Sequence, residues 1–146
     1  MSDLRGKRTT VANPMYEPQA YSKSGYRSFR AFYPYYLGEH SNAICRRLHL
    51  VGTTIAVSTL VRAIIAMIPL LDKDPLHRFA ALRFGQNGWK SIGKLLLGGF
   101  FQGYVWAWVG HFFFEKNRPA TFKHPLYSFI GDLTLWREVM TLQRRP

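Results

Sequence analysis

The sequence predicts an all-α protein, a small integral membrane helical hairpin flanked by amphipathic or interfacial helices. Two long apolar runs, Leu50–Leu71 and Leu95–Phe114, support this fold class. Each has about the 20 residues with which an α-helix crosses a bilayer core. A basic loop connects them, and the stretch that follows has apolar residues at helical spacing.

The N-terminal segment Met1–Tyr26 alternates basic, small and polar residues and contains no long apolar run. This pattern does not fit a secretory signal peptide, and Pro14 and Pro18 interrupt any helix. We expect an extended arm that is either disordered or laid along a partner. Residues 27–146 are expected to form one helical membrane domain.

The chain has 20 Lys and Arg against 8 Asp and Glu, a net charge of +12. This charge suits anionic lipids, nucleic acid or an acidic partner subunit. We expect no nucleic-acid binding, because the basic residues flank apolar runs instead of gathering on one soluble face. The single cysteine, Cys45, excludes an intramolecular disulfide and a Cys-rich zinc site.

The first predicted span, Leu50–Leu71, contains one charged residue, Arg62. A mid-membrane arginine costs about 2.5–3.5 kcal/mol unless it reaches a headgroup or pairs. Before the span, Ser41 and Asn42 are good N-cap residues, so a helix is expected to begin there. His40 would then lie on the loop that enters this helix.

Residues Asp72–Ser91 between the spans predict a basic loop with at most one short amphipathic helix, because they contain Pro75, Gly85 and Gly88. Lys and Arg are more numerous in both flanking parts than in this loop. Both termini are therefore expected on the more positive side of the membrane.

Small residues recur along both spans, a pattern that allows close helix approach in membranes. The first strip consists of Cys45, His49, Gly52, Thr53 and Ala56, and the second of Gly99, Gly103, Ala107, His111 and Glu115. After the second span, an interfacial helix is expected at 125–142, opened by Pro125.

Antiparallel spans bring His49, at the start of the first, to the same membrane side as His111 and Glu115, at the end of the second. If His40 folds back from its loop, three imidazoles meet. Neutral imidazoles and a carboxylate suit Fe(II), Zn(II) or Mn(II). The alternative is a set of hydrogen-bonded polar residues at the hairpin mouth, since polar pairs four residues apart are common at helix ends.

Several separated motifs resemble the Mpo1-like family, formerly a domain of unknown function (DUF962), over about Phe29–Met140. The motifs are the stretch from Phe32 to Asn42 (FYPYYLGEHSN), Cys45 to His49 (CRRLH), Gly52 to Thr54 (GTT), Gly103-Tyr104, Ala107 to His111 (AWVGH), Phe114 to Phe122 (FEKNRPATF), Pro125 to Ser128 (PLYS) and Gly131-Asp132.

That resemblance implies a helical membrane protein of the endoplasmic reticulum and an Fe(II)-dependent dioxygenase that shortens 2-hydroxy fatty acids by one carbon. The family's histidines match His40, His49 and His111, which would be catalytic metal ligands. Glu115 is a further ligand candidate from geometry alone. Arg47 or Arg118 could hold the substrate carboxylate as bidentate donors, or contact lipid headgroups instead.

Two other hypotheses remain open. The first is a non-catalytic accessory subunit of a larger assembly, such as a respiratory complex of the mitochondrial inner membrane, which would bind through the Met1–Tyr26 arm and the Asp72–Ser91 loop. The second is a protein that binds membrane lipids in the hairpin groove without turnover. Neither needs the metal.

Overall fold

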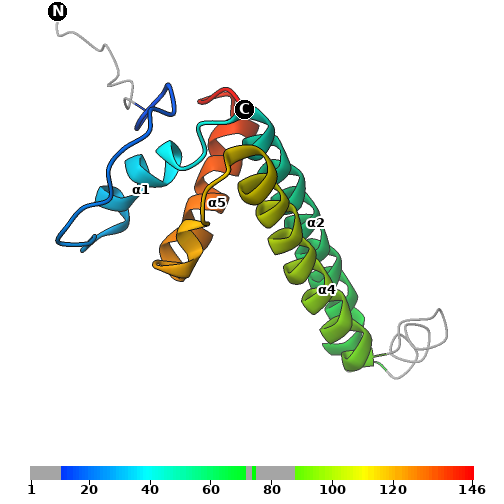
Figure 1. The fold of residues 1–146 in the computed structure, drawn as a ribbon. Coiled ribbons are helices and arrows are strands. Elements are labelled where there is room, and N and C mark those ends of the chain that lie inside the picture. The colour runs from blue at the N-terminus through cyan, green and yellow to red at the C-terminus, as the bar shows by residue number, and fades with distance from the viewer. Residues whose placement is uncertain (1–10, 72–73, 75–87) are drawn as a thin grey trace, which may run out of the picture.

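A computed structural model describes residues 11–71, 74 and 88–146 of the chain. These residues form helices and no strand, which confirms the all-α fold class. The elements in order are α1 (Phe29–Gly38), α2 (Ala43–Leu71), α4 (Gly88–Val109), the π-helix η1 (Gly110–Glu115), the 3-10 helix η2 (Ala120–Phe122) and α5 (Pro125–Met140). The long helices α2 and α4 run side by side, and α1 and α5 gather at one end of the pair (Figure 1).

The start of α2 follows the predicted cap. The Asn42 carboxamide oxygen accepts hydrogen bonds from the backbone N–H groups of Ile44 at 2.8 Å and Cys45 at 3.4 Å. Such a cap satisfies donors that have no partner within the first helical turn. The helix therefore begins at Ala43, earlier than the predicted span, and His40 lies on the loop before it.

One helix in the described part of the chain, α2, is long and apolar enough to cross a membrane, over Ala43–Ile68. Only 17% of its most apolar window is buried inside the structure, unlike the core helix of a soluble protein. Helix α4 is not among the helices of the described residues that meet the same test. That Leu95–Phe114 forms a second span stays a prediction. The α-helical part of the second one also begins earlier and ends at Val109.

Glycines set the contact between α2 and α4. A Cβ atom on Gly52 would lie 3.0 Å from the Trp106 Cβ and 3.1 Å from the Gly103 carbonyl oxygen. A Cβ atom on Gly99 would lie 2.6 Å from the Thr59 Cγ2. The expectation that small residues line a close helix contact is thus confirmed at these positions.

This contact predicts opposite effects of one substitution at two adjacent glycines. Gly99→Ala should lower the free energy of unfolding by about 1–3 kcal/mol, because a methyl group there overlaps the stiff Thr59 side chain. Gly98→Ala meets nothing within 4 Å and should be neutral or stabilise the helix by up to about 1 kcal/mol. Thermal unfolding in detergent micelles measures both, and equal effects would contradict the proposed tight contact.

Helix α5 buries Ser128, Gly131, Leu135 and Glu138 against the protein. Other apolar side chains of this helix are exposed, and Leu126 is 66% and Met140 51% exposed. The expected helix therefore forms, and it ends at Met140, two residues earlier than expected. Its place at a membrane interface stays a prediction.

The described part of the N-terminal arm, residues 11–26, contains no helix, and it packs on the chain itself. Tyr16 is buried and joins an aromatic core with Phe32, Tyr36 and other residues of α1 and α5. The arm was expected to be disordered or laid along a partner. Its described part instead packs on the protein itself, because it buries aromatic rings against α1.

The Asp72–Ser91 loop lies mostly outside the described residues. Arg62 is exposed on α2.

Candidate metal centre

Three buried histidines from separate parts of the fold lie in one cluster. His40 comes from the loop between α1 and α2, His49 from the second turn of α2, and His111 from η1. One ring nitrogen of each lies within 4.8 Å of the others, and the ring centroids are 4.4, 4.7 and 5.0 Å apart. The predicted convergence of the three imidazoles is confirmed.

Each imidazole is oriented by a hydrogen bond from its Nδ1 atom. The acceptors are the Tyr36 carbonyl oxygen for His40 at 2.6 Å, an Asp132 carboxylate oxygen for His49 at 2.7 Å, and the Asn117 Oδ1 for His111 at 2.7 Å. A carbonyl, a carboxylate and an amide oxygen can only accept, so each Nδ1 carries the proton. The lone pair is therefore on Nε2 in all three rings.

The amide of Asn117 is itself fixed in this orientation. Its Nδ2 atom donates to the Glu39 carbonyl oxygen at 3.1 Å and to a Glu39 carboxylate oxygen at 3.2 Å. The Oδ1 atom therefore faces His111. Asp132 likewise accepts from two groups, His49 and the Tyr36 hydroxyl at 2.5 Å. These outer residues give the cluster the support that holds histidine ligands in metalloproteins.

The residues present fit a bound transition metal ion. The Nε2 atoms of His40 and His49 are buried and have no hydrogen-bond partner within the described residues. Leaving buried polar atoms unpaired costs free energy, and a metal ion would satisfy both. Three imidazoles with free Nε2 lone pairs form a donor set that suits Zn, Fe, Cu or Ni more than Mg or Ca.

Burial favours the neutral form of His40. The pKa of His40 is held well below its usual value, first by burial and then by the neighbouring His49 and His111 rings. A neutral imidazole is the form that binds a metal, whereas a protonated one repels it. His40 is therefore in the form that can coordinate an ion at neutral pH.

His111 lies on a π-helix, η1, which replaces the last turns of the expected α-helix. The wider turn of a π-helix rotates side chains away from their α-helical positions, and such turns are frequent at functional sites. Lys116 ends η1 with a left-handed backbone, φ 58°, and its N–H donates to the His111 carbonyl. Gly110 allows the approach to α2, since a Cβ atom there would lie 3.0 Å from the Cys45 Sγ.

Glu115 has a different role from the predicted metal ligand. One carboxylate oxygen accepts from the Ser41 N–H at 3.0 Å and hydroxyl at 2.5 Å, and the other accepts from the Asn42 N–H at 2.8 Å. Both oxygens thus face the loop that carries His40 and the N-terminus of α2, where a negative charge is stabilised. Glu115 anchors the loop, and the described cluster consists of histidines alone.

The two arginines expected to hold a substrate carboxylate, Arg47 and Arg118, are both exposed, and neither lines the cavity at the histidines. Arg118 lines a separate cleft with Glu39 and Lys123. Their predicted contact with a substrate carboxylate at the histidines is therefore not supported by their positions, which suit the alternative contact with headgroups.

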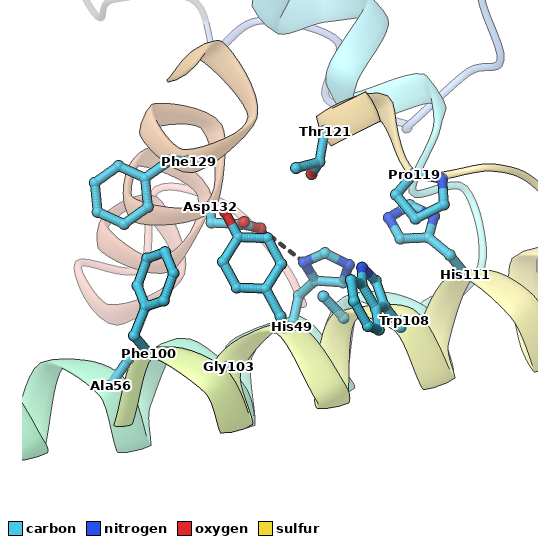
Figure 2. A pocket seen from close by; sticks show the side chains of 12 residues that line it. His49, Ala56, Phe100, Gly103, Trp108, His111, Pro119, Thr121, Phe129 and Asp132 are labelled. Atoms are coloured by element: carbon cyan, nitrogen blue, oxygen red, sulfur yellow. Dashed lines mark hydrogen bonds and ion pairs between the residues drawn. The ribbon is translucent and has the colours of Figure 1, made fainter. Parts of the chain in front are cut away.

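A cavity of about 60 Å³ lies beside His49 and His111. Figure 2 shows Thr121 above it, and Phe100 and Phe129 face one another at the end away from His111. The polar side chains of its lining belong to His49, Tyr104, Trp108, His111, Thr121 and Asp132. The cavity therefore offers hydrogen-bonding groups next to the cluster and aromatic rings farther away.

An apolar groove continues from this cavity. The two share Ala56, Phe100 and Phe129, and the groove has a volume of about 390 Å³. The rest of its lining is aliphatic, from Val57, Leu60, Leu96, Leu97 and Leu133. A small chamber with hydrogen-bonding groups near the histidines, followed by an apolar groove, fits an amphiphile with a compact head and an alkyl tail.

Asp132 and Asn117 support the cluster but were not recognised from the sequence as functional. Both stand within the motifs shared with the family. Asp132 is an acidic residue next to Gly131. Gly131 packs closely on α1, because a Cβ atom on it would lie 2.9 Å from the Tyr36 ring. An acidic residue next to a glycine of a close helix contact is the sequence signal that could have identified Asp132 as functional.

The fold and the cluster define a class: a small all-helical protein with a membrane-length helix and a buried three-histidine centre at one end of a helix pair. The chain belongs to the Mpo1-like family, because the family model described as "2-hydroxy-palmitic acid dioxygenase Mpo1-like" matches residues 26–144. The expected family is thereby confirmed. No curated protein and no solved structure matches the chain significantly.

Proposed function

We propose that the protein is an Fe(II)-dependent dioxygenase that shortens 2-hydroxy fatty acids by one carbon, with His40, His49 and His111 as the iron ligands. The observation that carries the proposal is the set of three buried imidazoles whose Nδ1 protons are engaged, with the Nε2 atoms of His40 and His49 lacking a hydrogen-bond partner among the described residues. The name of the matching family supports the substrate class and the reaction type.

The overall reaction consumes one O2 per 2-hydroxy acid and yields CO2, water and the fatty acid with one carbon fewer. Bound iron would supply the activation of O2 that organic side chains cannot provide. The chain supplies the remaining functions. It holds the ring planes of His49 and His111 through Asp132 and Asn117, and it buries the three histidines.

The cavity and groove give the substrate an orientation. The carboxylate and 2-hydroxyl belong in the chamber beside the histidines, where Thr121 and Tyr104 offer hydroxyl groups. The alkyl tail belongs in the groove between Ala56, Phe100 and Phe129, which is lined by aliphatic side chains. Since α2 has membrane length, such a tail can arrive from the acyl region of a bilayer.

The direct test uses purified full-length protein in detergent, reconstituted with Fe(II) under anaerobic conditions. We expect about one iron per chain and, after O2 is admitted, equal amounts of CO2 and pentadecanoic acid from 2-hydroxypalmitate. Palmitate, which lacks the hydroxyl, should not react. A protein that binds no iron, or that releases no CO2 when loaded, would contradict the proposal.

Substrate length should depend on Ala56, which lines both the chamber and the groove. We expect Ala56→Phe to lower kcat/KM for 2-hydroxypalmitate about tenfold or more relative to 2-hydroxyoctanoate, because a large ring blocks the passage to the groove. Ile55→Phe, at a neighbouring position that lines neither space, is the matched control. Equal losses for both chain lengths would argue against the groove as the tail site.

Two further measurements distinguish the proposed enzyme from the lipid-binding protein and from the accessory subunit. A lipid-binding protein would retain acyl chains during purification and show no turnover with iron. An accessory subunit would migrate with a large complex after gentle extraction, whereas an enzyme of this kind would run as a small species.

A further inference from the structure

The N-terminal segment Ala12–Glu17 lies outside the family-matched residues but is connected to the histidine cluster. Arg144 forms a first link, because its guanidinium donates to the carbonyl oxygens of Asn13 at 2.8 Å and of Ala12. The Arg144 Nε donates to the buried carboxylate of Glu138 at 2.7 Å. The Tyr16 hydroxyl adds a bond to the Arg145 carbonyl oxygen at 2.5 Å. The segment is therefore held against the C-terminal part of the chain.

The ring of Tyr16 lies between two guanidinium groups. The Arg46 guanidinium carbon is 3.8 Å from the ring centroid, and that of Arg144 is 5.0 Å away. Tyr16 itself is only 5% exposed. A cation over an aromatic face is attracted more strongly when both are shielded from water, so this stack constrains the Arg46 side chain.

Arg46 in turn holds the loop that carries His40. Its Nη1 atom donates to the carbonyl oxygens of His40 at 2.8 Å and Ser41 at 2.7 Å. Glu115 binds the N–H groups of Ser41 and Asn42 on the same loop. Two charged side chains therefore fix this loop, one through its carbonyl oxygens and one through its N–H groups.

The position of the Arg46 guanidinium has little other support. Its buried Nε has no hydrogen-bond partner among the residues that the structure describes, and its Nη2 reaches the Pro146 carbonyl oxygen only at 3.5 Å. The Tyr16 ring is consequently the main surface against which the guanidinium is oriented while it binds the His40 carbonyl.

We propose that Tyr16 is a positioning residue of the metal centre, which acts through Arg46 to set the backbone of His40. The proposal rests on the proposed function, since it requires the histidines to hold a metal. It gives a segment outside the matched region a part in the geometry of the site. Co(II) is a suitable probe, because its visible spectrum reports the number and arrangement of its ligands.

The experiment titrates Co(II) alone into full-length protein in detergent and records the spectrum. We expect Tyr16→Leu, which keeps apolar volume but removes the aromatic face, to weaken Co(II) binding about tenfold and alter the spectrum. Tyr16→Phe keeps the ring and should bind Co(II) like the wild type. Met15→Ala, at the neighbouring position that is 75% exposed, is the matched control.

The outcomes separate this proposal from the proposed function. If Tyr16→Leu lowers the unfolding temperature while Co(II) affinity and spectrum stay those of the wild type, Tyr16 is merely structural and the proposal is wrong. Equal weakening by Tyr16→Phe would also contradict it, because the aromatic face would then be irrelevant. If the wild type binds no Co(II), the proposed metal centre fails together with this inference.

Discussion

Replacing His111 by alanine is expected to abolish CO2 release from 2-hydroxypalmitate and to reduce the iron content of the purified protein to background. The change removes one of three imidazole ligands and leaves a cavity beside His49. Two remaining imidazoles are a weak donor set for Fe(II), and removing a member of a catalytic unit usually costs most of the activity. Metal analysis and an assay of released CO2 measure the two effects.

The control for this variant is His124→Gln. His124 is a histidine outside the cluster, whose Nε2 forms a 3.0 Å hydrogen bond with the Tyr21 hydroxyl. This variant should retain iron and turnover. Undiminished turnover in the His111 variant would contradict the iron centre, whereas loss in both variants would indicate a general defect in folding.

The second large effect is expected for Asp132→Ala. Asp132 accepts the Nδ1 proton of His49 and the hydroxyl proton of buried Tyr36 with the same carboxylate oxygen. Removing such an outer partner typically weakens metal binding about 10–100-fold, because the ligand loses its orientation and its basicity. Isothermal titration with Fe(II) or Co(II) measures the change in affinity.

Asp132→Asn provides the comparison for this result. The amide oxygen still accepts from His49 but carries no charge, so the loss of affinity should be smaller than in the alanine variant. Identical metal affinity in Asp132→Ala and the wild type would show that His49 needs no support from α5, and the interpretation of the outer residues would then be wrong.

The sequence was sufficient to predict the site at the level of chain topology. Two long antiparallel helices place the start of one near the end of the other, and this topology predicts that His49 and His111 lie close together. The N-cap at Asn42 added His40, because a helix that begins at Ala43 leaves that residue on a loop. These steps depend on helix length and capping, which are local and strong signals.

The directions in which side chains point could not be predicted from the sequence. The expectation that Glu115 lies near His111 and the other histidines assumes a continuous α-helix from Gly99 to Glu115. The chain changes to a π-helix at Gly110. Glu115 consequently binds the loop at Ser41 instead of joining the histidines. No local signal in the sequence marks the π-helix, which begins where Gly110 packs against Cys45.

Helix α1 was also not predicted. Its sequence, FRAFYPYYLG, is rich in aromatic residues that are weak helix formers and contains Pro34. Most of its residues are buried. Tertiary burial of the rings stabilises this helix, and the Ser28 hydroxyl caps it by accepting from the Ala31 N–H.

The three histidines stand on separate elements of the chain: a loop after α1, the body of α2, and the π-helix after α4. An ion bound to all three would act as a cross-link between segments up to 71 residues apart in sequence, as the numbering of His40 and His111 gives. Ion binding and folding would then be thermodynamically linked, and the unfolding temperature would rise with the concentration of free metal. The supply of the bound ion would then affect the stability of the fold as well as any activity of the site.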